Sequence, residues 1–179
     1  NTIFLMSSFT REDVVIAFLR FSIVHASLYY CLRKQMSEED METKTVISVE
    51  ATVDASLEKV WDYWTAPAHI VNWNAASPDW HTPKASNDLK VGGELFCRME
   101  AKDGSFGFDL KGTYTAVEPL KQLNYVFEDD RKVGVAFSAI DGQTKVVQHF
   151  EAENQNPVEM QKAGWQAIID SFKNYTENN

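Results

Sequence analysis

The residues best suited to metal binding or nucleophilic catalysis are few in this chain of 179 residues. Its four histidines include no pair with the i, i+2 or i, i+4 spacing of a local metal site. Its two cysteines are too few for a four-thiolate zinc site or a disulfide framework. These residues are His25, His69, His81, His149, Cys31 and Cys97. The sequence therefore predicts no metal site and no cofactor.

Patterns for acid–base or nucleophilic catalysis are also weak. Asp79 and His81 place an acid near an imidazole, but side chains this close in sequence rarely face each other productively. Cys97 stands within an alternation of apolar residues, which is typical of an inert buried thiol. The sequence context of a nucleophile elbow is missing at Ser77, Ser86, Ser105, Ser138 and Ser171. We expect no catalytic residue from these patterns.

Polar residues within strand-like segments are more informative. Gln148 occupies an apolar position of its strand, and a buried amide without a hydrogen bond costs about 1–3 kcal/mol. It could hold a polar group of a ligand, bind a buried water, or face outward beside a bulge. His149 falls on the opposite face and is expected to meet solvent. Arg98 is expected to face outward, although a shifted register would turn it into the interior as an anion anchor.

The composition excludes several classes of protein. Hydrophobic residues make up 44% of the chain, as in soluble globular proteins, so collagen, disorder and a polytopic membrane protein do not fit. The chain has 17 Lys and Arg against 26 Asp and Glu, a net charge of −9 that would repel nucleic-acid phosphates. Aromatic residues reach 12%, which indicates a thick core or an apolar cavity.

The composition changes near residue 42, so we divide the chain into an extension, 1–42, and a domain, 43–179. The segment from Val14 to Leu32 is apolar apart from a few residues. As a membrane span it would carry Arg20 near its middle, where a charged side chain raises the free energy of membrane insertion by about 2.5–3.5 kcal/mol. As a signal peptide it would have Glu12 and Asp13 where positive charge is needed. We favour an accessory amphipathic helix, or sequence that is not native to the domain.

The first half of the domain combines a strand with two short helices. Residues 45–53 alternate between apolar and polar, which predicts a half-buried strand. Apolar residues at i, i+3, i+4 and i+7 then predict a helix over 57–64 with Ser56 as its N-cap. Pro67 suits the start of a second short helix. The polar stretch from Ala75 to Asp88 is expected to be a loop, with Trp80 as a candidate cap over a cavity mouth.

The second half predicts antiparallel strands followed by a long helix. Alternating segments near 95–99, 106–114, 123–127, 133–137 and 146–150 are joined by short turns, which imply antiparallel pairing. Asn156 is then expected to cap a helix that begins at Pro157 and runs to about Tyr175. The predicted fold is α+β, with a curved antiparallel sheet wrapped around this helix. The two short helices would close one end.

Several segments resemble a known superfamily. The helix containing "VWDYWT" is similar to the start of SRPBCC, or START-like, domains. The segments "DLKVGGEL" at 88–95, "GTYTAVEP" at 112–119 and "GWQAIIDSFKNY" at 164–175, together with Trp73, resemble the branch named after the activator of the heat-shock-protein-90 ATPase. The resemblance covers 43–179 and implies a helix-grip (START/Bet v 1-like) fold with a cavity between the sheet and the C-terminal helix.

Within such a fold, one group of side chains would converge between sheet and helix. Either they fill the core completely, or they line a ligand cavity with Tyr114, Tyr125 and Gln148 as its polar groups. The full set is Trp64, Trp73, Phe108, Tyr114, Tyr125, Phe127, Phe137, Gln148, Trp165, Ile169 and Phe172.

Three functions follow from the resemblance. Relatives in the superfamily bind lipids, sterols, polyketides or plant hormones, so we expect a cytoplasmic, non-catalytic domain that binds a small hydrophobic molecule. This requires a cavity of about 300 Å³ or more. The second function is a co-chaperone-like interaction module that binds a chaperone partner through its acidic surface. The third is a cyclase- or hydrolase-type enzyme, which requires a cavity-facing group with a strongly shifted pKa. The sequence does not decide whether the domain forms a homodimer. We expect no nucleic-acid or membrane partner for the domain.

Overall fold

The computed structural model describes residues 44–179. Our predictions for residues 1–42, including the apolar segment and Cys31, lie outside the described residues. The element order is β1 (Val46–Val53), α2 (Leu57–Thr65), α3 (Pro67–Trp73), β2 (Trp80–Asn87), β3 (Glu94–Ala101), β4 (Gly107–Glu118), β5 (Gln122–Phe127), β6 (Lys132–Ile140), β7 (Gln143–Glu151) and α4 (Val158–Asn178). None of the described helices is long and apolar enough to cross a membrane.

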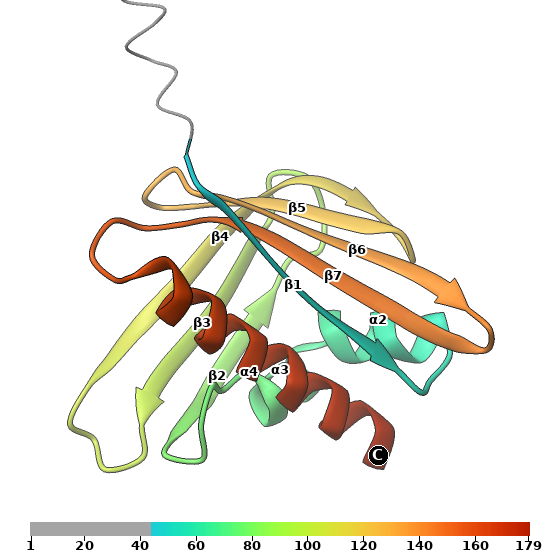
Figure 1. The fold of residues 1–179 in the computed structure, drawn as a ribbon, viewed down its shortest axis with the longest axis horizontal. Helices are drawn as coiled ribbons and strands as arrows, with labels where there is room; N and C mark the ends of the chain where they lie inside the picture. The colour runs from blue at the N-terminus through green and yellow to red at the C-terminus, as the bar shows by residue number, and fades with distance from the viewer. Residues whose placement is uncertain (1–43) are drawn as a thin grey trace, which may run out of the picture. The chain divides into compact units, whose positions relative to one another are not determined.

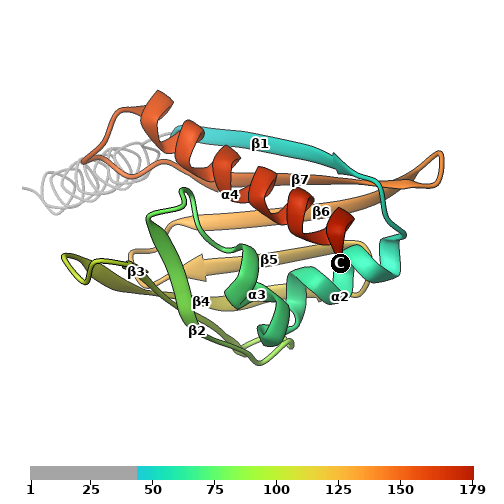
Figure 2. The same cartoon turned by 90° about the horizontal axis from the view of Figure 1, so that it is seen from below.

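The strands form one seven-stranded sheet in the order β1-β7-β6-β5-β4-β3-β2, and every neighbouring pair is antiparallel. The sheet curls around α4, which crosses its concave face, and α2 and α3 lie beside the C-terminal end of that helix (Figures 1 and 2). This arrangement confirms the predicted α+β helix-grip fold. It follows from the short turns, which pair consecutive strands and leave β1 to close against β7.

One predicted loop is wrong, because Trp80–Asn87 forms strand β2 at the edge of the sheet. Its sequence lacks clear alternation and contains Pro83. The pairing with β3 shifts between His81 and Lys84, so the proline falls within a bulge of an edge strand, where no ladder hydrogen bond is lost. The polar composition therefore indicated an exposed edge rather than a loop.

The helix ends only partly match the sequence signals. Ser56 caps α2 as predicted, accepting a 3.3 Å hydrogen bond from the Lys59 backbone N–H. Asn156 does not cap α4: the helix begins at Val158, and the Asn156 side chain instead donates to the Glu153 carboxylate at 2.7 Å. Gln161 binds the backbone of the same loop, donating to Glu153 and Asn156 carbonyls at 2.9 and 2.8 Å. Side chains of the loop and of the first turn of α4 therefore fix the start of the helix without a conventional cap.

Aromatic packing joins α4 to the two short helices. The Trp64 ring meets the Phe172 ring edge-on at 4.8 Å between centroids, and the Trp73 ring does so at 5.0 Å. Phe172 is completely buried. Burial of one such side chain contributes about 1.5–3 kcal/mol, so this cluster holds α2, α3 and α4 as one unit beside the sheet.

Candidate functional site

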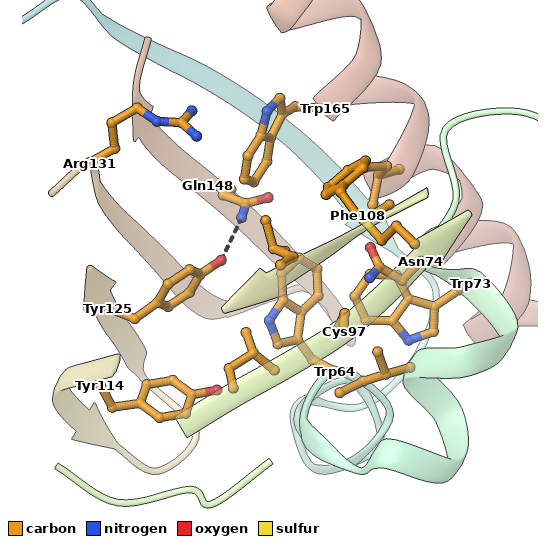
Figure 3. Close-up of a pocket in the computed structure, with 15 residues that line it drawn as sticks. Trp64, Trp73, Asn74, Cys97, Phe108, Tyr114, Tyr125, Arg131, Gln148 and Trp165 are labelled. Atoms are coloured by element: carbon orange, nitrogen blue, oxygen red, sulfur yellow. Dashed lines mark hydrogen bonds between the residues drawn. The ribbon is translucent and has the colours of Figure 1, made fainter. Parts of the chain in front are cut away.

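An inner cavity of about 230 Å³ lies between the concave face of the sheet, α3 and α4. Most of its wall is buried and apolar, and it is smaller than the 300 Å³ that we expected for a complete ligand site. Its lining residues are Trp64, Ile70, Trp73, Asn74, Leu95, Cys97, Met99, Phe108, Leu110, Tyr114, Tyr125, Arg131, Gln148, Trp165 and Ile168 (Figure 3).

The structure brings only part of the predicted site set to this cavity. Seven of those residues line it, namely Trp64, Trp73, Phe108, Tyr114, Tyr125, Gln148 and Trp165. The other four, Phe127, Phe137, Ile169 and Phe172, are buried in the core but do not line the cavity. Apolar periodicity selects residues that face the interior, and it cannot separate a filled part of the interior from a hollow one.

Sequence reasoning missed two polar lining residues. Asn74 lies just after α3, and Arg131 lies in the turn between β5 and β6, so neither belongs to an element with a period that could be read. Cys97, in contrast, lines the cavity from β3 as a buried thiol, as its apolar alternation predicted. Leu95 and Met99 line the cavity from the same strand.

The interior polar groups are neutral. The Gln148 amide donates a 3.3 Å hydrogen bond to the Tyr125 hydroxyl, drawn as a dashed line in Figure 3. Burial raises the pKa of Tyr125, and it raises the pKa values of Tyr114 and of the Cys97 thiol to about 12. All three groups therefore stay protonated near neutral pH and offer hydrogen bonds without charge.

Arg131 supplies the positive charge of the cavity wall. Its side chain is 20% exposed, and its Nε donates to Asp129 Oδ2 at 2.8 Å. The guanidinium carbon lies 5.3 Å from the centre of the Phe127 ring, in cation–π geometry. Figure 3 shows this side chain on the same side of the cavity as Tyr125 and Gln148. The ion pair and the ring together fix where the guanidinium lies.

An outer groove of about 590 Å³ adjoins the inner cavity. Its apolar rim is open to solvent: Phe106 is 63% exposed and Met160 is 65% exposed. Trp80 on β2 packs against Phe106 and Phe108 with centroids 6.2 and 6.0 Å apart, so this candidate cap lines the groove and not the inner cavity. The groove and the cavity share the lining residues Met99, Phe108, Arg131, Trp165 and Ile168.

The remaining polar candidates lie away from this site. Arg98 faces outward as expected and pairs with Glu100 and Asp109 at 3.1 and 3.2 Å, so it does not anchor an anion in the cavity. His81 pairs with Glu100 at 3.3 Å instead of with Asp79. Across residues 44–179, no three His, Cys, Asp or Glu side chains lie together as a metal-ion site.

His149 is exposed on β7, as its register predicted. His69 lies on α3 and shares a 2.9 Å hydrogen bond with the Tyr175 hydroxyl of α4. Its ring stacks on that of Tyr63 at 3.8 Å between centroids. Both histidines are therefore structural or solvent-facing residues, outside the cavity wall.

Comparisons with known proteins identify relatives of this fold. The family model described as "Activator of Hsp90 ATPase homolog 1-like protein" matches residues 54–177. An AHSA1-like protein from Aeromonas hydrophila, solved by NMR, is 46% identical with a TM-score of 0.71, over 75% of this chain and 93% of that one. A protein from Cytophaga hutchinsonii is 49% identical with a TM-score of 0.64, over 76% of this chain and 93% of that one.

A more distant structure, CalU16 from Micromonospora echinospora, is 19% identical with a TM-score of 0.54, over 73% of this chain and 75% of that one. At this identity the likeness concerns the fold alone. The search of curated proteins finds no match.

Proposed function

Because the chain belongs to the Activator of Hsp90 ATPase homolog 1-like family of the SRPBCC superfamily, we propose that it binds a small hydrophobic molecule between its sheet and C-terminal helix. The observation that carries this proposal is the inner cavity. Protein interiors are normally packed to the density of organic crystals, whereas the side chains around this partly open, mostly apolar space of about 230 Å³ lack packing partners on one side. A bound apolar molecule would restore them.

The two adjoining spaces indicate how such a molecule would lie. The inner cavity alone is small for a ligand site, whereas the groove of about 590 Å³ falls within the usual range of about 300–1,000 Å³. A ligand that fills the cavity and extends past Phe108 and Trp165 into the groove would use both. Its inner end would contact Trp64 and Trp73, and its outer end would reach solvent beside Met160.

The chemistry of the wall favours binding over catalysis. The inner cavity is lined by no carboxylate or imidazole among the described residues. Burial raises the pKa values of Cys97 and Tyr114 to about 12, away from the range in which a base or thiolate works near neutral pH. The cyclase or hydrolase alternative therefore lacks a poised acid, base or nucleophile within the described cavity.

Native mass spectrometry of the full chain tests the proposal. We expect a retained apolar molecule, or uptake of an added one such as decanol, at one molecule per chain. Leu110→Trp should abolish the uptake because the larger ring occupies the cavity that Leu110 lines. Ile140→Trp is the matched control, since Ile140 is exposed at the end of β6 and does not line the cavity. Equal uptake by both variants, or no uptake by the unmodified chain, would contradict the proposal.

A second candidate function is a co-chaperone-like interaction module, favoured by the exposed apolar rim of the groove. Contiguous apolar surface that stays exposed often marks a protein-binding site. Phe106→Ser and Met160→Ser remove much of that surface without touching buried packing. Loss of low-salt binding to a chaperone ATPase in these variants would support the module, and absence of binding by the unmodified chain would exclude it.

A further inference from the structure

Arg131 lies where a ligand passing from the inner cavity to the outer groove would have to pass. Its side chain lines both spaces and is only 20% exposed. Trp165, Phe108, Met99 and Ile168 are the other residues that line both, and all of them are apolar apart from the indole N–H. The junction between the two spaces therefore has one charge, and that charge is positive.

One edge of this guanidinium is already occupied. Asp129 accepts from its Nε at 2.8 Å and from the Arg131 backbone N–H at 3.3 Å. The two terminal amino groups, Nη1 and Nη2, have no hydrogen-bond partner among residues 44–179. Because the Phe127 ring packs against the guanidinium, it is held in place with those two donors unused. A half-buried cation with unused donors gains from any ligand that brings an acceptor.

The two carboxylates near Arg131, those of Asp129 and Glu153, do not replace such a ligand. Asp129 is 54% exposed and already holds the Nε edge. Glu153 lines the groove, but it accepts hydrogen bonds from the backbone N–H groups of Gln155 and Asn156 and from the Asn156 side chain. Its oxygens are thus directed into its own loop. The Nη groups of Arg131 stay available to a molecule in the junction.

We infer that the ligand is an apolar monocarboxylic acid, whose carboxylate accepts two hydrogen bonds from Nη1 and Nη2 of Arg131 while its apolar body lies in the inner cavity. This inference rests on the proposed binding function. A planar guanidinium matches a carboxylate as a fork, which a single neutral acceptor does not exploit. The Gln148–Tyr125 pair lies on the same side of the cavity and leaves the region toward Trp64 and Trp73 for the apolar body (Figure 3).

A matched pair of probes, decanoate and decanol, tests this inference by calorimetric titration near neutral pH. The two share one chain and differ only at the head group. We expect the unmodified full-length chain to bind decanoate about tenfold or more tightly than decanol, as charge-assisted hydrogen bonds predict. Arg131→Gln should remove this preference and leave decanol binding unchanged. Arg131→Lys keeps the charge but loses the fork, so its preference should be intermediate.

Arg98→Gln is the control, because it removes one positive charge from the outer face of the sheet, where the side chain pairs with Glu100 and Asp109 and does not line the cavity. It should leave the preference for decanoate intact. Equal binding of both probes by the unmodified chain would overturn the carboxylate assignment while the cavity proposal stands. Binding of neither probe would instead count against the cavity proposal itself. A full preference retained in Arg131→Gln or Arg131→Lys would also overturn the assignment.

Discussion

The Gln148 amide and the Tyr125 hydroxyl are joined by a 3.3 Å hydrogen bond on the wall of a mostly apolar cavity. Both residues are buried, and they come from β7 and β5, on either side of β6. A polar pair in such a place is retained only if each partner satisfies the other or a ligand completes it. This relationship makes the pair the most informative place to separate packing from binding.

Substitution of either partner should reveal their coupling. Gln148→Leu leaves the buried Tyr125 hydroxyl without its partner, and we expect a loss of about 1–3 kcal/mol in the free energy of unfolding. Adding Tyr125→Phe removes the orphaned hydroxyl and should recover part of the loss. Urea unfolding of the two single variants and the double variant measures the coupling energy. Strictly additive losses would show that the hydrogen bond contributes nothing.

Gly112 on β4 controls the position of the Tyr125 ring. A Cβ at this residue would lie 2.8 Å from Tyr125 Cδ2, closer than such atoms approach. Gly112→Ala should therefore displace the ring from the cavity wall, destabilise the domain by about 1–3 kcal/mol and weaken ligand binding.

Gly164→Ala on α4 is the matched control for this substitution. A Cβ there meets nothing within 4 Å, so the helix should gain up to about 1 kcal/mol in stability. Thermal unfolding of both variants gives the comparison. Similar behaviour of the two would contradict the packing described for Gly112.

Because Tyr114 is buried, we expect the free energy of unfolding of the domain to fall at alkaline pH. Burial raises its pKa from the ordinary 10.0 to about 12, so the folded chain holds this proton more tightly than the unfolded chain. The resulting stability is complete below pH 10 and is lost as the pH rises toward 12, by about 3 kcal/mol in total. Tyr114→Phe should make the stability curve less steep over that interval, while the buried Tyr125 and Cys97 still contribute to its slope. An unchanged slope in this variant would argue that Tyr114 ionises normally.

Cys97 should be unreactive in the folded chain. Burial raises the pKa of this thiol to about 12, and the side chain is enclosed by the cavity wall. In a Cys31→Ser background, an aromatic disulfide reagent should label Cys97 at neutral pH only after unfolding, because thiolates are the reacting species. Rapid labelling of the folded chain would instead reveal a reactive thiol and revive the enzyme hypothesis.

Alternating strands and helices with clear apolar faces predicted an antiparallel sheet wrapped around a long helix, and the family resemblance identified this arrangement as a helix-grip fold. Ile169 and Phe172 illustrate the limit of such patterns. Their periodicity correctly predicted that both side chains face the interior. Both fill the core, yet Ile168, the residue directly before Ile169, lines the cavity. Whether an inward side chain meets atoms or space depends on the curl of the sheet, which no local pattern records.

Polar segments are a second case in which sequence patterns did not predict the structure. Trp80–Asn87 was expected to be a loop because an exposed edge strand with a proline has little apolar alternation. Arg131 was missed because its position on the cavity wall depends on the turn between β5 and β6 and on the contact of its guanidinium with the Phe127 ring. Neither feature produces a local sequence pattern. Such residues become visible only once the sheet is folded.

The central claim is that an apolar molecule enters the inner cavity. It is tested most directly by NMR, following the chemical shifts of the indole N–H groups of the five tryptophans during titration with decanol. Trp64, Trp73 and Trp165 line the cavity, whereas Trp61 does not. We predict saturable shifts of the three cavity signals, with the Trp61 signal unchanged. Shifts confined to Trp80 at the groove, or no saturable shift at all, would contradict the claim.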